Sequence, residues 1–554
     1  MKKNFTVLCY ILFFASIGYS QFKPLNVQAS LNNVLRYGSG LENRGGQDFG
    51  KEYFENIADG RLKVNDFVIG FRLEISDPIE YGLNFKGLRK RYMEYNNTTE
   101  GISVRAGDFW DLVGRGLSLN SFENRSQAYD TGIDGIRITY KKTIGNKNPV
   151  KVKAQILGGD IDYNDFLNFS RKEIYKVRDA NFEISPVKFL TLGTNYVFAN
   201  GSIMSTDLKT ITNLKADIPE GYINFNLADL QIFTSYAHKH VATEPNKLYP
   251  VSLTPKGDAL YTSLSYSKPK YGLTIDYKNY RFDLTAPDNQ ATDRPTRMLP
   301  FQNPPTALKE HSSTLISRNP HVVNFNDEVG GQFDFVYAPS EKLTFNFNAG
   351  IASKHYEYKN TDTTGRVVYG RVERSGSFFP SLNDALSPFW EFYLEGEYYA
   401  TKSFYAKVAY ARQGNVIYNQ INSLLSEKQF YTTIPTEFKY SITKEYTLKL
   451  NLEQQFGHNS IRRDNKDFMN TMIALTLSKT PDMSCTISGE FTDDNEDPTG
   501  KKFWALGEAS YKITPTNTVT ASFGTERGGL RCTSGICRYV NPFNGFRLTV
   551  NSIF

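Results

Sequence analysis

The chain has 554 residues, of which 40% are hydrophobic and 14% are aromatic, and its mean hydropathy is −0.45. The chain has one apolar run, at the N-terminus, and it is shorter than the ~20 residues of a helical span; no second long apolar run exists, which excludes a membrane protein built from several helices. The 64 basic residues fall to 62 without Lys2 and Lys3, against 58 acidic residues. This near-neutral balance gives no reason to expect nucleic acid or another polyanion as a partner.

The N-terminus has the order of a secretory signal peptide. Two lysines precede an apolar run over Phe5–Ile17, and the small residues Gly18 and Ser20 occupy positions −3 and −1 of a cleavage site. The alternative is a membrane anchor, but this run is shorter than a spanning helix. The pattern therefore predicts a signal peptide over residues 1–20, cleaved after Ser20.

Short stretches of alternating apolar and polar residues recur in the rest of the chain, for example at 343–351, 390–398, 448–453 and 518–523. Period-two alternation places apolar side chains on one face of a strand and polar side chains on the other. Short connections rich in Pro, Asn, Asp and Ser alternate with long polar connections. A soluble β-protein is the competing class, but this alternation of connections is typical of transmembrane β-barrels with short periplasmic turns and long outer loops.

We therefore expect an all-β fold, in which a single large transmembrane antiparallel β-barrel fills residues 21–554. The strand count is expected to be even and about 24, within a range of about 18 to 26, with both termini in the periplasm. The longest outer loops are expected at 284–327 and 359–386. Because the first strand begins near 27–31, we expect no separate plug domain of the kind that TonB-dependent receptors carry. A loop acting as the plug remains the alternative.

The last residues of the chain form a strand that ends on an aromatic residue. Phe546, Leu548, Val550 and Phe554 alternate with polar residues. This ending resembles the assembly signal of bacterial outer-membrane β-barrels. The resemblance implies a bacterial outer-membrane location, contact with outer-membrane lipid, and the barrel-assembly machinery as a partner during biogenesis.

A series of glycine-rich motifs runs through 106–117, 122–125 and 130–137, and further matching stretches lie at 31–33 and 527–540. Together they resemble an uncharacterised Bacteroidota-type outer-membrane β-barrel family, a domain of unknown function. The chain departs from that family's pattern at Trp110, Asp111 and Val113, where Tyr, Glu and Phe are expected. Since the family has no assigned activity, the resemblance implies location and fold and adds nothing about a substrate.

The same region concentrates charges of both signs. The candidate constriction residues are Asp108, Asp111, Arg115, Glu123, Arg125, Asp130, Asp134 and Arg137. Facing carboxylates and guanidinium groups inside a lumen would impose a transverse field on a passing solute. A structural ion-pair network that fixes an inserted loop or the barrel wall requires only the pairing, and we favour it. The residues expected to line the lumen elsewhere are Glu391, Glu395, Glu397 and Lys407.

Cys532 and Cys537 lie in the last outer loop, where the oxidising route through the periplasm favours a disulfide. A metal-binding pair is the alternative, but no further Cys or His is close in sequence. His238 and His240 share a strand face and could hold a metal, although an exposed position at the barrel rim explains them equally well. We predict no catalytic residues, no metal and no cofactor.

Three functions fit these features. The first is a passive or loop-gated channel for small hydrophilic solutes, because a barrel of more than ~16 strands has an aqueous lumen unless loops fill it. The second is a structural or accessory subunit of an outer-membrane secretion or surface complex, with a loop-filled lumen. An enzyme with its site at the barrel rim ranks last, and we expect that the protein is not an enzyme.

Overall fold

The computed structural model describes residues 26–147, 149–165, 169–205, 208–248, 250–252, 254, 256–283, 299–360, 369–420, 422–533 and 535–554. The signal peptide predicted at 1–20 lies outside these residues. So do 284–298 of the long loop expected at 284–327, and 361–368 of the loop expected at 359–386.

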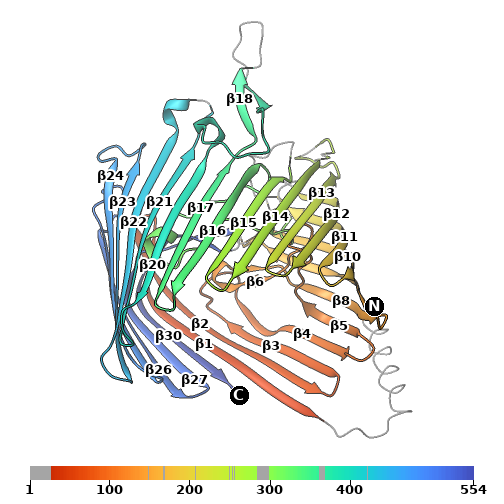
Figure 1. Ribbon diagram of the computed structural model, residues 1–554, viewed down its shortest axis with the longest axis horizontal. Helices are drawn as coiled ribbons and strands as arrows, with labels where there is room; N and C mark the ends of the chain where they lie inside the picture. Colours follow the sequence, from red (N-terminus) through yellow and green to blue (C-terminus); the bar gives the residue numbers. More distant parts are fainter. Residues whose placement is uncertain are drawn as a thin grey trace.

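Twenty-four antiparallel strands form one closed β-barrel, and each strand pairs with its neighbours in the chain (Figure 1). The first strand pairs with the second and also with the last, which closes the ring. The strands of the barrel are β1 (Val27–Arg44), β2 (Gln47–Val64), β3 (Phe67–Ser76), β4 (Phe85–Asn97), β5 (Ile102–Phe109), β8 (Ile133–Ile144), β9 (Val150–Asn164), β10 (Lys172–Val187), β11 (Leu190–Met204), β12 (Ile211–Leu227), β13 (Leu230–Thr243), β14 (Lys256–Lys268), β15 (Tyr271–Arg281), β16 (Glu328–Ser340), β17 (Leu343–Ser353), β20 (Phe389–Tyr399), β21 (Phe404–Ile417), β22 (Glu427–Ser441), β23 (Tyr446–Asn459), β24 (Asp467–Lys479), β25 (Met483–Thr492), β26 (Phe503–Thr514), β27 (Asn517–Glu526) and β30 (Phe543–Ile553).

Shorter elements lie in the connections between these strands. They are β6 (Glu123–Asn124), η2 (Arg125–Gln127), β7 (Tyr129–Asp130), α2 (Thr314–Ser317), β18 (Tyr356–Asn360), β19 (Tyr369–Glu373), η3 (Asp384–Leu386), η4 (Ser423–Leu425), β28 (Gly529–Thr533) and β29 (Ile536–Val540). The β18–β19 hairpin extends beyond the barrel at its upper end in Figure 1.

The two faces of the wall differ as the alternation predicts. On β24, Ile473, Leu475 and Leu477 are exposed on the outer face, whereas Thr476 and Ser478 belong to the opposite face. Cys485 on β25 is also exposed. No helix among the described residues is long and apolar enough to cross a membrane. The outer apolar band is the surface that a barrel presents to lipid.

Short turns gather at one end of the barrel, for example at Asn65 and Asp66 between β2 and β3. The first and last strands also meet at that end, where the backbone N–H of Leu31 donates to the carbonyl of Phe554 at 3.0 Å. The longer connections, including 77–84, 110–132 and 299–327, leave the barrel wall at the other end.

The expectation of a barrel with no separate plug domain needs correction, because the barrel interior is filled in part: segments of two long connections occupy it. Val113 and Leu119 of one connection, and Phe301 and Phe325 of the other, are buried against inward-facing wall residues such as Val197 in a single apolar cluster. The alternative, in which loops act as the plug, describes these residues better. Loop composition could not show this, because a polar connection looks the same in sequence whether it folds outward or inward. We call 110–132 and 299–327 the first and second interior segments.

Candidate functional site

The first interior segment is joined to the wall through shared ion pairs. Arg72 on β3 pairs with Asp59 on β2 and with Glu123 in the segment, at 2.7 Å in both cases. Arg125 in turn pairs with Glu74 of the wall at 3.2 Å. The Asp59 carboxylate is half exposed, but Glu123 and Glu74 are mostly buried, and each of these two buried carboxylates has a guanidinium partner that compensates its charge.

A second attachment centres on Asp130, which Lys90 of β4 approaches at 2.8 Å. The indole N–H of Trp110 also donates to this carboxylate, at 3.1 Å. Burial by itself would raise the pKa of Asp130, but the Lys90 ammonium outweighs it, and the pKa lies below the usual range. Asp130 is therefore charged at neutral pH and serves as an anchor.

The remaining candidate constriction residues are distributed around the segment. Asp108 lies 3.8 Å from Lys90, and Asp111 pairs with Arg137 at 3.1 Å. The Arg115 guanidinium lies 5.2 Å from the centre of the Phe233 ring. Asp134 pairs with Arg91 at 3.3 Å, and both of these side chains are exposed. Asp134 is thus apart from the buried group. The carboxylates are paired with cations, several of them on the wall, an arrangement that a structural network requires. The constriction hypothesis stays a prediction.

The second interior segment is held by carboxylates of the wall. Glu453 on β23 accepts hydrogen bonds from the backbone N–H groups of Thr314 and Leu315, at 2.9 and 2.7 Å. Arg318, just beyond α2, pairs with Glu490 on β25 and donates to the carbonyl of Gly528. Anions suit the start of a helix because its first N–H groups lack partners within the helix.

The residues expected to line the lumen lie together on β20 and β21. Glu391 lies 2.7 Å from the His311 ring nitrogen, and Glu395 lies 3.6 Å from Lys407. Glu397 accepts a hydrogen bond from Tyr405 at 3.1 Å. Glu391 therefore contacts the second interior segment, while the other three form part of the wall below it.

Hydroxyl side chains are frequent on the inner face of β24–β27, opposite the lipid-facing residues of these strands, where they lie beside Leu506, Glu508 and Lys512 of β26. The hydroxyl residues are Thr476, Thr486, Ser488, Ser510, Thr518, Thr520 and Ser522, all of them half buried. Thr476 and Thr486 lie 2.9 Å apart, and Thr520 donates to Ser510 at 3.1 Å. We call this surface the hydroxyl wall. It contributes nothing to the apolar cluster that fills the side near β8–β15.

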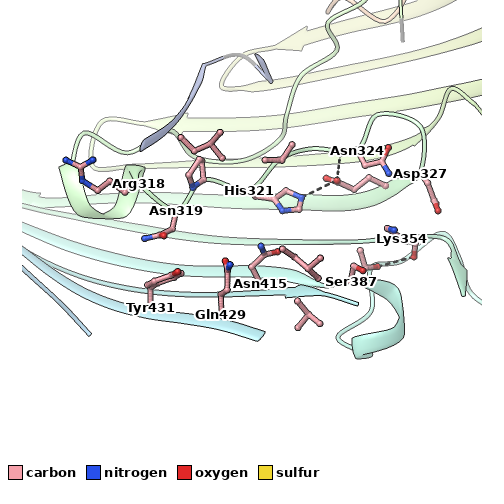
Figure 2. A pocket seen from close by; sticks show the side chains of 17 residues that line it. Arg318, Asn319, His321, Asn324, Asp327, Lys354, Ser387, Asn415, Gln429 and Tyr431 are labelled. Carbon is pink, nitrogen blue, oxygen red and sulfur yellow. Dashed lines mark hydrogen bonds and ion pairs between the residues drawn. The ribbon is translucent and has the colours of Figure 1, made fainter. Parts of the chain in front are cut away.

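Two of the cavities are lined by polar and apolar side chains together. One, of about 380 Å³, is lined by residues near the short-turn end and beneath the first interior segment, including Asn32, Arg61, Arg72 and Arg105. The other, of about 450 Å³, lies between residues 318–328 and the ends of wall strands (Figure 2). We call the latter the outer cavity.

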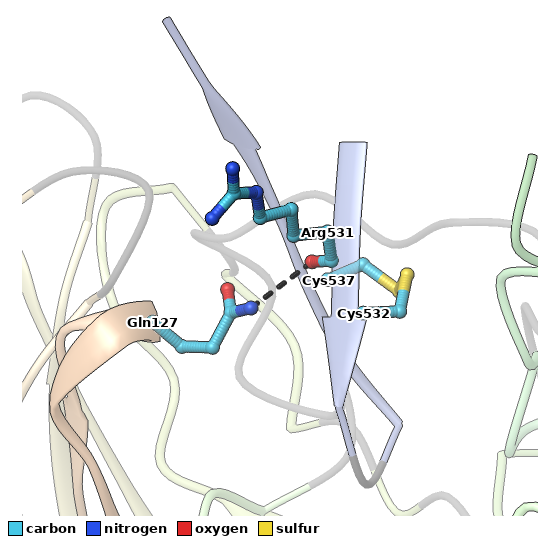
Figure 3. Close-up of a disulfide and its surroundings, with 4 residues drawn as sticks. All are labelled: Gln127, Arg531, Cys532 and Cys537. Carbon is cyan, nitrogen blue, oxygen red and sulfur yellow. Dashed lines mark hydrogen bonds between the residues drawn. A yellow bond between two sulfur atoms is a disulfide. The ribbon is translucent and has the colours of Figure 1, made fainter. Parts of the chain in front are cut away.

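The predicted disulfide between Cys532 and Cys537 is present and joins β28 to β29 (Figure 3). Its hairpin packs against the interior segments: the Gln127 amide donates to the carbonyl of Arg531 at 3.1 Å, and Ile536 belongs to the buried apolar cluster. The disulfide therefore stiffens a hairpin that covers the plug.

Within the described part of the chain, no group of three or more His, Cys, Asp or Glu side chains could hold a metal ion. His238 and His240 belong to no such group. Sequence reasoning missed Arg72, Glu453 and the outer cavity. Alternation along β3 and β23 could have placed the two charges on the lumen face, but their partners lie in distant segments.

A family model described as "Family of unknown function" (DUF6029) matches residues 1–554. The chain belongs to the DUF6029 family. This agrees with the expected membership of an uncharacterised family, while the Bacteroidota source stays an expectation. No curated protein matches the chain.

Solved structures similar to this DUF6029 barrel include one named copper transporter OprC, with 11% identity and a TM-score of 0.42 over 97% of this chain and 81% of that chain. The siderophore receptor PirA from Pseudomonas aeruginosa has 8% identity and a TM-score of 0.44, over 96% and 81%. The FrpB iron transporter from Neisseria meningitidis has 10% identity and a TM-score of 0.39, over 96% and 83%. The printed names of these three structures are those of two transporters and one receptor.

Proposed function

We propose that this DUF6029 protein is a loop-gated channel of the bacterial outer membrane that passes small hydrophilic solutes. The observation that supports this proposal best is the unequal filling of the lumen. The apolar cluster packs the interior segments against β8–β15, while the hydroxyl wall on β24–β27 is half buried and polar and takes no part in that cluster. A polar surface beside a movable plug is what a gated aqueous path requires.

The same proposal places both termini in the periplasm, with the short turns, and the long connections toward the cell exterior. The apolar residues of the last strand, Phe546, Leu548, Val550 and Phe554, would be recognised by the barrel-assembly machinery before the ring closes. Outer-membrane lipid would then cover the outer face.

Conductance across a planar lipid bilayer tests the channel directly. A variant with Cys485→Ser and Ser510→Cys carries one free thiol on the hydroxyl wall, and Cys485→Ser with Ala509→Cys carries one on the adjacent outer face. We expect stepwise currents that a charged thiol reagent reduces in the Ser510→Cys variant and leaves unchanged in the Ala509→Cys variant. A folded barrel without current, or equal effects on both variants, would contradict the proposal.

A second candidate is an accessory subunit of an outer-membrane complex, with a permanently filled lumen. The attachment of the second interior segment at Glu391, Glu453 and Glu490 favours it, because each contact holds the segment to the wall. An electrically silent barrel that co-purifies with a defined partner would support this alternative.

A further inference from the structure

We propose that the outer cavity binds a neutral, polyhydroxylated solute of mono- to disaccharide size. This inference names the solute class of the proposed channel, but the binding site itself stands on the geometry of the cavity. At about 450 Å³ the cavity falls within the ~300–1,000 Å³ typical of small-molecule sites. It lies where a solute arriving from outside would first meet the barrel interior.

Amide and phenol groups lie side by side on one wall of this cavity. Asn415 and Gln429 are directly opposite in the pairing of β21 with β22, and Tyr431 is the next inward residue on β22. Figure 2 shows these side chains on the wall below Asn319, which belongs to the second interior segment. Each amide offers a donor and an acceptor, and a phenol offers both, which is the complement of a ligand that carries several hydroxyl groups.

Part of this bonding capacity is unused. Among the described residues, the side chains of Asn415 and Tyr431 form no hydrogen bond, whereas the Gln429 amide donates to Glu427 at 2.6 Å. Tyr431 is only 8% exposed, so its hydroxyl reaches little beyond the cavity. A polar ligand would supply the partners that these groups lack.

The charges around the cavity are already compensated. Arg318 pairs with Glu490, and Asp327 lies 2.7 Å from the ring of His355. Glu328 lies 2.6 Å from Lys278, and Lys354 is likewise engaged within the chain. An ionic ligand would bring a charge that finds no free counter-charge here, which is costly away from water. A neutral ligand meets no such penalty.

Apolar groups complete the lining. Pro320, Val322, Val416 and Leu530 surround the polar groups, and the ring of Tyr431 lies 6.2 Å from that of Phe468 in a T-shaped contact that fixes its orientation. A few placed polar groups within an apolar frame suit a ligand with a carbon skeleton and hydroxyl edges.

Calorimetry on the full mature barrel in detergent tests the inference with a panel of glucose, maltose, lactose and sucrose, and with glucuronate and glucosamine as charged probes. We expect saturable binding of at least one neutral sugar and no binding of the charged ones. The combined substitutions Asn415→Leu and Tyr431→Phe should weaken binding about tenfold or more, as expected for two lost hydrogen bonds. Tyr405→Phe, lumen-facing at the far end of β21, serves as the matched control and should bind normally.

If the wall variant fails to fold, Asn319→Ala in the interior segment provides the same test without altering a strand. Absence of binding by every neutral sugar, binding of glucuronate at equal affinity, or binding that neither variant weakens would each overturn the inference. Conductance is measured separately, so the two proposals fail independently. Currents without sugar binding would support the channel proposal and contradict the proposed sugar site. Sugar binding to a barrel without current would support the site and contradict the channel.

Discussion

One guanidinium nitrogen of Arg72 reaches both carboxylate oxygens of Glu123, at 2.8 and 2.7 Å, across 51 positions in the chain. The same guanidinium group holds Asp59 of the neighbouring strand at 2.7 Å. A single cation therefore joins two wall strands to the first interior segment. The stability of the plug and that of the wall are coupled at this point.

Removing one partner of this group should loosen the first interior segment. Glu123→Gln is expected to cost about 1–3 kcal/mol, because a mostly buried Arg72 keeps only Asp59 as its counter-charge. A double-mutant cycle of Glu123→Gln with Arg72→Gln, measured by urea unfolding in vesicles, gives the coupling energy. Additive effects of the two substitutions would show that the pair contributes nothing.

The attachment of α2 to the wall should depend on the charge of Glu453. Glu453→Gln keeps one acceptor oxygen but loses the charge that two backbone N–H groups now share, so hydrogen exchange at 313–317 should accelerate about tenfold. Glu508→Gln, an exposed substitution on β26, is the matched control and should leave exchange unchanged. Equal exchange in both variants would mean that the carboxylate does not hold the helix.

Reduction of the disulfide should act on the hairpin and leave the barrel intact. Without the bond between Cys532 and Cys537, the unfolded hairpin gains conformational entropy, which lowers the stability of the hairpin by about 2 kcal/mol. Hydrogen exchange over 529–540 should therefore rise in the Cys532→Ser, Cys537→Ser variant, while the far-ultraviolet thermal transition of the barrel stays in place. A lowered barrel transition would assign the disulfide a global role.

Mild acid should loosen the outer rim through His355. Burial lowers the pKa of His355 below its usual 6.5, although Asp327 opposes this shift. Because the unfolded state then binds the proton more readily, stability is present above about pH 6.5 and declines as the pH falls below it. Protection of the amides at 354–356, measured as exchange relative to the intrinsic rate at each pH, should be lower at pH 5.5 than at pH 7.5, and a His355→Gln variant should lose this pH dependence. A pH response that survives in His355→Gln would point to another group.

The wall of the barrel could be predicted from the sequence, and its interior could not. Alternation at 343–351 or 518–523 reports on faces of single strands, a local property with period two. The partners of Glu123 and Glu453 depend on where a connection folds relative to the barrel wall. The alternation of residues along single strands carries no information about the path of a connection. The disulfide was predictable from two neighbouring cysteines, but the packing of Ile536 within the plug was not.

Pairing of β1 with β30 sets the order of events during biogenesis. Strand β1, which begins at Val27, can pair with its second neighbour only after β30 (Phe543–Ile553) has been synthesised and has reached the barrel. Until then two rows of backbone donors and acceptors are unpaired, a state prone to association with other chains. A chain cut before its last strand would stay in that state, so only synthesis through to the last strand yields a sealed wall.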